Sequence, residues 1–141
     1  MMLEACLLIQ LVACCAMTGI IWMVQIAVYP LFGRLEEPAF SDYHHRYTRQ
    51  VTWVIAPLMF LEATSGAACL FLGEWSDFLV PSLLLGLIWA STAFIQVPQH
   101  QRLTQANVPA LVRSNWIRTA AWTARSGFLF SLSLRLFSDA G

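Results

Sequence analysis

Four long apolar segments constrain this chain more than any other feature of its sequence. They cover residues 3–32, 51–72, 78–97 and 114–137, and a helix needs roughly 20 apolar residues to cross the hydrocarbon core of a bilayer. Hydrophobic residues make up 58% of the chain and charged residues 11%, against roughly 25% charged in soluble proteins. One soluble domain of this size could not bury so much apolar surface. The sequence therefore predicts an all-α, polytopic membrane protein, with residues 1–141 forming a single four-helix transmembrane bundle.

The polar stretch after the first segment contains a second pattern. Two acidic residues and a proline at 36–38 are typical of a helix start. From there, aromatic residues recur at helical spacing, so an amphipathic lead-in over about 38–50 is expected to run into the second membrane helix. Proline disrupts regular helix hydrogen bonding. Pro57 is therefore expected to kink the second helix, and Pro98 is expected to close the third.

The arginines predict how the bundle is oriented. Most of them lie in the connections between helices 1 and 2 and between helices 3 and 4: Arg34, Arg46, Arg49, Arg102 and Arg113. The opposite side has only Arg135. Positively charged connections stay in the cytoplasm, so both termini are expected outside, in a multi-pass protein of the inner (plasma) membrane. The formal net charge of +0 gives no electrostatic case for binding nucleic acid. The expected partners are the lipid bilayer and other membrane proteins.

Two charged residues lie about halfway along apolar segments. Glu62 is in the second segment and Arg125 is in the fourth, and both helices run in the same direction, so the two charges lie at matching depth. A lone charge at that depth costs roughly 2.5–3.5 kcal/mol on insertion scales. We therefore expect an ion pair. It could be a static pair that sets helix register or part of a functional site, and both interpretations predict contact.

Polar residues also recur at helical spacing along the first, third and fourth segments, so each set shares one helix face. The candidate pocket residues are Gln25, Tyr29, Glu62, Gln96, His100, Asn115, Arg118 and Arg125, with Trp22, Trp89 and Trp122 as aromatic walls. One interpretation is a polar pocket in the cytoplasmic half of the bundle. The other is hydrogen bonding between helices, worth roughly 0.6–2 kcal/mol per contact.

Metal and haem sites find little support in the sequence. A carboxylate-bridged di-iron bundle needs several intramembrane carboxylates, and Glu62 alone is available. A bis-His haem needs two histidines at facing positions, whereas His44, His45 and His100 lie outside the apolar segments. A metal site at the membrane surface would use His44 or His45 with His100. The alternative is exposed or hydrogen-bonded histidines. The sequence identifies neither a cofactor nor a catalytic residue.

Several stretches resemble a family of bacterial four-helix membrane proteins. They are the VQ…YPLF stretch at 24–32, the QVPxHxRL stretch at 96–103 and the LVRxNWIRT stretch at 111–119, followed by Trp122 and Arg125. This resemblance implies the fold and no particular reaction. The chain is more loosely similar to the anthrone-oxygenase-like family, through Pro98, His100 and Leu103 with a spacing one residue different. That similarity implies oxygenation of a polycyclic phenolic substrate and assigns no residue a role.

Two functions agree with these patterns. In the first, the chain binds a small lipophilic molecule, as a binding protein or an enzyme. Arg118 and Arg125 would then hold an anionic or phenolic oxygen, and Glu62 or His100 would move protons. In the second, the chain is a structural or accessory subunit of a larger membrane complex, and its polar stripes lock helices together. Transport has less support, because four helices without an internal repeat offer little basis for alternating access.

Overall fold

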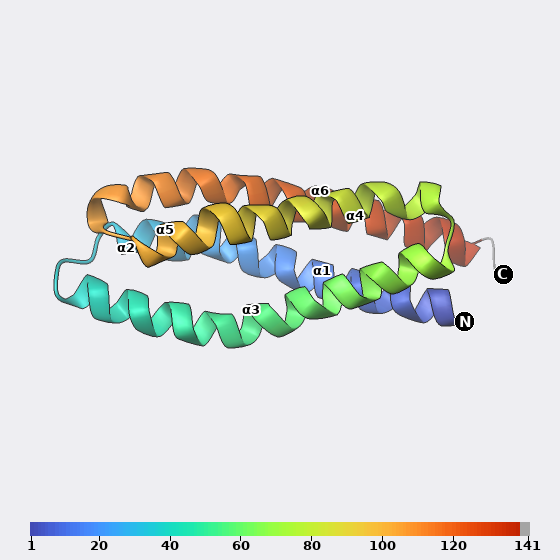
Figure 1. Ribbon diagram of the computed structural model, residues 1–141, viewed down its shortest axis with the longest axis horizontal. Helices are drawn as coiled ribbons and strands as arrows, with labels where there is room; N and C mark the ends of the chain where they lie inside the picture. Colours follow the sequence, from blue (N-terminus) through green and yellow to red (C-terminus); the bar gives the residue numbers. More distant parts are fainter. Residues whose placement is uncertain (139–141) are drawn as a thin grey trace.

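The computed structural model describes residues 1–138, which form four long helical rods packed side by side in an antiparallel bundle (Figure 1). The all-helical class predicted from the sequence is confirmed, and residues 1–138 contain no strand. The first rod consists of α1 (Met2–Met23), η1 (Val24–Val28) and α2 (Tyr29–Phe32), and the second is α3 (Ala39–Leu72). The third rod consists of α4 (Trp75–Ser91), η2 (Thr92–Gln96) and α5 (Val97–Gln101). The fourth rod, after the short η3 (Gln105–Asn107), is α6 (Val108–Ser138).

Three of the rods are long and apolar enough to cross a membrane: Met2–Phe32, Ala39–Leu72 and Trp75–Gln101. The fourth, α6, is long but less apolar, because its buried face carries Asn115, Arg118 and Arg125. Large apolar side chains are exposed on the outside of the bundle; Phe71 and Phe94, for example, are 89% and 80% exposed. Extensive exposed apolar surface marks a face that contacts another apolar medium, so this exterior suits a lipid environment.

The prolines act differently from the sequence-based expectation. The third rod does not close at Pro98 but continues to Gln101, and the first rod similarly continues past Pro30 to Phe32. In each rod a five-residue π-helical turn directly precedes the segment that contains the proline: η1 before Pro30 and η2 before Pro98. Proline lacks an N–H group, and its ring clashes with the carbonyl four residues earlier. A wider π turn removes that conflict without ending the helix.

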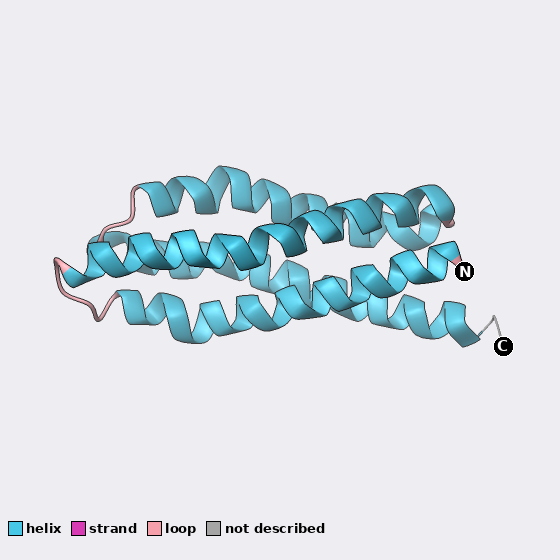
Figure 2. Cartoon of the chain, turned by 90° about the horizontal axis from the view of Figure 1, so that it is seen from below, coloured by secondary structure: helices cyan, strands magenta, loops and turns pink. Residues whose placement is uncertain are grey.

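The amphipathic lead-in and the second apolar segment form one continuous helix, α3, of 34 residues. At a rise of about 1.5 Å per residue, a helix of this length extends well beyond a ~30 Å hydrocarbon core. The N-terminus and the C-terminal end of α6 lie at one end of the bundle, called here the terminal end (Figures 1 and 2). We call the opposite end, with the connections 33–38 and 102–107, the distal end. There the N-terminal part of α3 lies apart from α5 (Figure 1).

Apolar side chains fill the bundle in two clusters. The larger cluster runs from the terminal end to the middle and includes Leu7, Met17, Ile88 and Leu129. Helices α1 and α3 approach closely in this region: a Cβ atom added at Gly66 would lie 2.6 Å from the end of the Gln10 side chain. The smaller cluster, at the distal end, comprises Val24, Tyr29, Phe32, Phe40, Val108 and Leu111.

Candidate functional site

Two buried arginines on α6 organise the polar interior of the bundle. Arg118 is 7% exposed and Arg125 is fully buried. Seven residues make about two helical turns, so the two side chains leave α6 on the same face at different depths. Their surroundings differ in charge and in packing.

Arg125 is surrounded by acceptors. It forms an ion pair with Glu62, which is also fully buried, and the pairing predicted from the sequence is confirmed. The Arg125 Nε atom donates a hydrogen bond to the Pro81 carbonyl oxygen at 3.1 Å. The Gln10 amide oxygen accepts from Arg125 Nη2 at 2.9 Å, and Trp122 Nε1 donates to the second carboxylate oxygen of Glu62 at 3.1 Å. Every charge at this level is therefore paired and hydrogen bonded.

Arg118 has no acidic partner among the described residues, whose ion pairs are Met1–Glu4, Glu62–Arg125 and Asp77–Arg135. Its Nε and Nη2 atoms both donate to the Asn115 side-chain oxygen, at 3.0 and 2.6 Å. Its other contacts are longer: Nη1 donates to Thr92 Oγ1 and Nη2 donates to the Tyr29 hydroxyl, both at 3.4 Å. The Arg118 Cζ atom also lies 6.0 Å from the centre of the Trp122 ring. All these partners are neutral, so no acidic side chain compensates this buried positive charge.

Asn115 is held in place by the first rod. Its amide nitrogen donates to the Gln25 side-chain oxygen at 2.8 Å, and Gln25 in turn donates to the Val112 carbonyl oxygen at 3.1 Å. Gln25 belongs to the π turn η1, so this turn directs an amide across to α6. Both Gln25 and Asn115 are buried, and their role is to orient Arg118 from behind.

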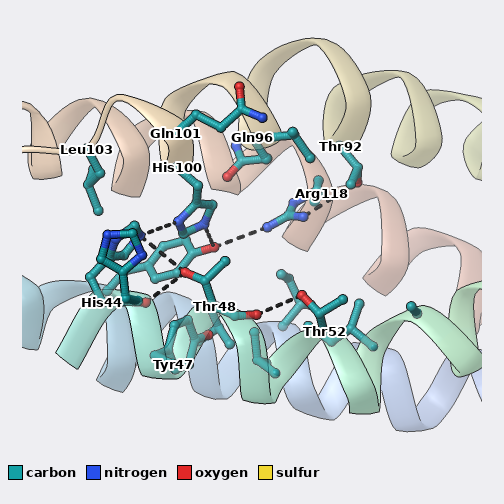
Figure 3. Close-up of a pocket in the computed structure, with 18 of the residues that line it drawn as sticks. His44, Tyr47, Thr48, Thr52, Thr92, Gln96, His100, Gln101, Leu103 and Arg118 are labelled. Atoms are coloured by element: carbon teal, nitrogen blue, oxygen red, sulfur yellow. Dashed lines mark hydrogen bonds between the residues drawn. The ribbon is translucent and has the colours of Figure 1, made fainter. Parts of the chain in front are cut away.

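A hydrogen-bonded chain leads from Arg118 towards the distal end (Figure 3). The Tyr29 hydroxyl, which accepts from Arg118, lies 2.9 Å from His100 Nε2. His100 Nδ1 lies 3.0 Å from His44 Nε2, and the two imidazole rings are parallel within 8°. Each histidine nitrogen can donate or accept, depending on the tautomer. Such a chain can pass a proton between Tyr29 and His44 when all its members exchange donor and acceptor roles together.

A cavity of about 570 Å³ lies beside this chain, between α3 and the third rod, in which η2 carries Gln96 and α5 carries His100 (Figure 3). Its polar wall includes Tyr29, His44, Thr48, Thr92, Gln96, His100 and Arg118, and its apolar wall includes Val24, Val51, Ile55, Ala56 and Met59. Gln96 is 1% exposed, and its amide nitrogen donates to Ser114 Oγ at 2.9 Å. Its amide oxygen has no hydrogen-bond partner. The cavity thus has both an apolar and a polar wall.

The candidate pocket residues separate into three groups in the structure. Tyr29, Gln96, His100 and Arg118 line the cavity, whereas Gln25 and Asn115 lie behind Arg118. Glu62 and Arg125 form a separate centre closer to the termini. None of the three tryptophans expected as walls is among the lining residues: Trp122 binds Glu62, Trp22 binds Thr123, and the Trp89 nitrogen is buried without a partner.

Sequence reasoning missed the α3 wall of the cavity. His44, Thr48 and Thr52 lie four residues apart and line it together. Their spacing puts them on one helix face, and that periodicity was the available signal. From the sequence, His44 is either a metal ligand or an exposed or hydrogen-bonded histidine. Among residues 1–138, no three His, Cys, Asp or Glu side chains gather closely enough to hold a metal ion. His44 and His100 instead face each other directly.

Comparison of the chain with known protein families, with curated proteins and with solved structures finds no match.

Proposed function

We propose that this chain is an inner-membrane protein with four spans that binds a small lipophilic molecule in its distal cavity. Three rods are apolar enough to span a membrane, and α6 is proposed as the fourth span because its polar residues face the bundle interior. The arginines of the distal connections favour a cytoplasmic distal end and external termini. A reporter enzyme fused to the C-terminus that is active only in the cytoplasm would contradict this orientation.

The cavity itself supports the binding function. Small-molecule pockets have volumes of about 300–1,000 Å³ with mostly apolar walls and a few polar groups. A volume of about 570 Å³ falls within this range. A helical subunit whose polar residues served only to lock its helices together would have no use for such a space. Because the cavity lies between α3 and α5, a molecule dissolved in the bilayer would enter between these two helices.

An enzymatic role for the same cavity is a second candidate, favoured by the chain from Tyr29 through His100 to His44. Histidine is the commonest general acid or base in enzymes. His100 has one nitrogen on the Tyr29 hydroxyl and the other on His44, at 2.9 and 3.0 Å. This arrangement would let His100 exchange a proton with a bound molecule through Tyr29.

The binding function is tested by filling the cavity. Ala56 lines it, whereas Val54, two residues earlier on α3, is 54% exposed on the outer surface. Wild-type protein, Ala56→Trp and Val54→Trp would be purified in nanodiscs, extracted with solvent and examined by mass spectrometry. We expect a lipophilic compound that co-purifies with the wild type and with Val54→Trp but not with Ala56→Trp. Equal compound profiles for all three proteins would favour the accessory-subunit hypothesis.

A further inference from the structure

Building on the proposed binding function, we infer that the molecule bound in the cavity is an amphiphile with one carboxylate group, which pairs with the Arg118 guanidinium. Both the charge at Arg118 and the geometry of its contacts point to this class of ligand. The apolar wall of the cavity then holds the tail of the molecule.

An anion in the cavity would compensate the charge at Arg118. An ionised side chain that is removed from water without a partner is costly, and buried charges are normally paired. The chain meets this requirement at Arg125, where Glu62 supplies the carboxylate. At Arg118 the nearby groups are an amide, two hydroxyls and the Trp122 ring, all of them neutral. The acidic side chain that lines the cavity, Glu37, is exposed and forms no ion pair with Arg118. A carboxylate on the ligand would supply the missing charge.

The geometry leaves one edge of the guanidinium available. Asn115 occupies the edge formed by Nε and Nη2, with contacts of 3.0 and 2.6 Å. The edge formed by Nη1 and Nη2 has only the two 3.4 Å contacts to Thr92 and Tyr29, which are longer than the ~2.9–3.0 Å of a typical N–H···O hydrogen bond. Two parallel N–H groups on one edge match the two oxygens of a carboxylate.

The apolar wall indicates where the tail lies. Val51, Ile55 and Met59 follow one another at intervals of four residues along α3 and all line the cavity. Residues at this spacing share one helix face, and the series runs from the distal part of α3 towards the middle of the bundle. A ligand with its carboxylate at Arg118 would lay an acyl or similarly apolar chain along this face.

Photoreactive probes with one common tail can test the assignment. The tail would carry a diazirine and end in either a carboxylic acid or its methyl ester, and the protein would be held in phosphatidylcholine nanodiscs. We expect the acid to label α3 between residues 51 and 59 about tenfold more strongly than the ester, the factor that a charged hydrogen bond typically provides. Peptide mapping by mass spectrometry measures the labelling. This comparison within the wild-type protein does not depend on any variant folding.

Two variants then test whether the preference for the acid over the ester depends on Arg118. In Arg118→Gln, acid labelling should fall to the level of the ester. The matched control is Arg113→Gln, because Arg113 lies on the same helix near the same end but is exposed and outside the cavity. This control should keep the wild-type preference. A preference that survives Arg118→Gln would overturn the inference.

The remaining outcomes separate this inference from the proposed function. Equal labelling by acid and ester in the wild-type protein, still abolished by Ala56→Trp, would overturn the carboxylate assignment and keep the binding function. No labelling above the Ala56→Trp background would overturn both. Loss of acid labelling when phosphatidylglycerol replaces phosphatidylcholine would show that an anionic lipid headgroup occupies Arg118, and would overturn the assignment to a free carboxylate amphiphile.

Discussion

The regions around Arg125 and Arg118 both bury a positive charge, but they surround it with different groups. Around Arg125, four helices supply a carboxylate, an amide oxygen, an indole and a backbone carbonyl. Around Arg118, the contacts are neutral and a cavity of about 570 Å³ adjoins the guanidinium. A buried charge that is fully paired contributes to the architecture, whereas a buried charge left unpaired beside a cavity is suited to binding.

Backbone geometry separates the two regions as well. At the Arg125 level, Gly66 lets α1 and α3 approach closely, with Gln10 packed against its Cα. At the Arg118 level, the π turns η1 and η2 contribute Gln25 and Gln96, and α3 lies apart from α5 (Figure 1). π turns within α-helices frequently occur at functional sites, where they redirect side chains. The bundle is thus closely packed around Arg125, whereas a cavity adjoins Arg118.

The largest effect on stability is expected from removing one partner of the ion pair between Glu62 and Arg125. Glu62→Gln and Arg125→Gln should each lower the free energy of unfolding in detergent by about 3–5 kcal/mol, because each leaves an unpaired buried charge. The double variant should lose less than the sum of the two. The control pair is Asp77→Asn with Arg135→Gln, since the side chains of Asp77 and Arg135 are 20% and 56% exposed and such pairs contribute about 0–1 kcal/mol. Additive losses at Glu62 and Arg125 would contradict their coupling.

A smaller effect is expected where α1 meets α3. In Gly66→Ala the new methyl group must displace Gln10, which accepts a hydrogen bond from Arg125. In Gly86→Ala, by contrast, the added Cβ would have no neighbour within 4 Å, and alanine favours a helix over glycine by about 1 kcal/mol. Thermal unfolding should therefore find Gly66→Ala less stable than Gly86→Ala by about 1–3 kcal/mol. Equal stabilities would show that the contact between Gln10 and Arg125 contributes little.

The smallest effect on stability is expected at Arg118 itself. Arg118→Gln removes a buried charge and leaves no carboxylate behind, so the ligand-free protein should change by no more than about 1 kcal/mol and could gain stability. Chemical denaturation of ligand-free Arg118→Gln and Arg125→Gln, measured side by side, tests this difference directly. A loss at Arg118 as large as that at Arg125 would mean that both arginines are structural, and the distinction between the two regions would fail.

The sequence by itself determined the helical class and the pairing of Glu62 with Arg125. Apolar segments of membrane-spanning length can satisfy their backbone groups in lipid only as helices, and two opposite charges at equal depth have little alternative to pairing. The same periodicity also identified the polar faces of the first, third and fourth rods. These inferences depend on residue spacing along one helix at a time, which the sequence states directly.

Only the tertiary structure decided that Arg118 has no acidic partner among the described residues, and where the cavity lies. Arg118 and Arg125 occupy the same face of α6, and their different surroundings depend on where α3 and α4 cross that face. The course of the third rod beyond Pro98 depends on a π turn that the local rule for proline does not anticipate. The wall formed by His44 and Thr48 likewise depends on how far α3 stands from α5. Spacing along a helix sets the direction and depth of a side chain, but distances between helices follow from the packing of all four rods together.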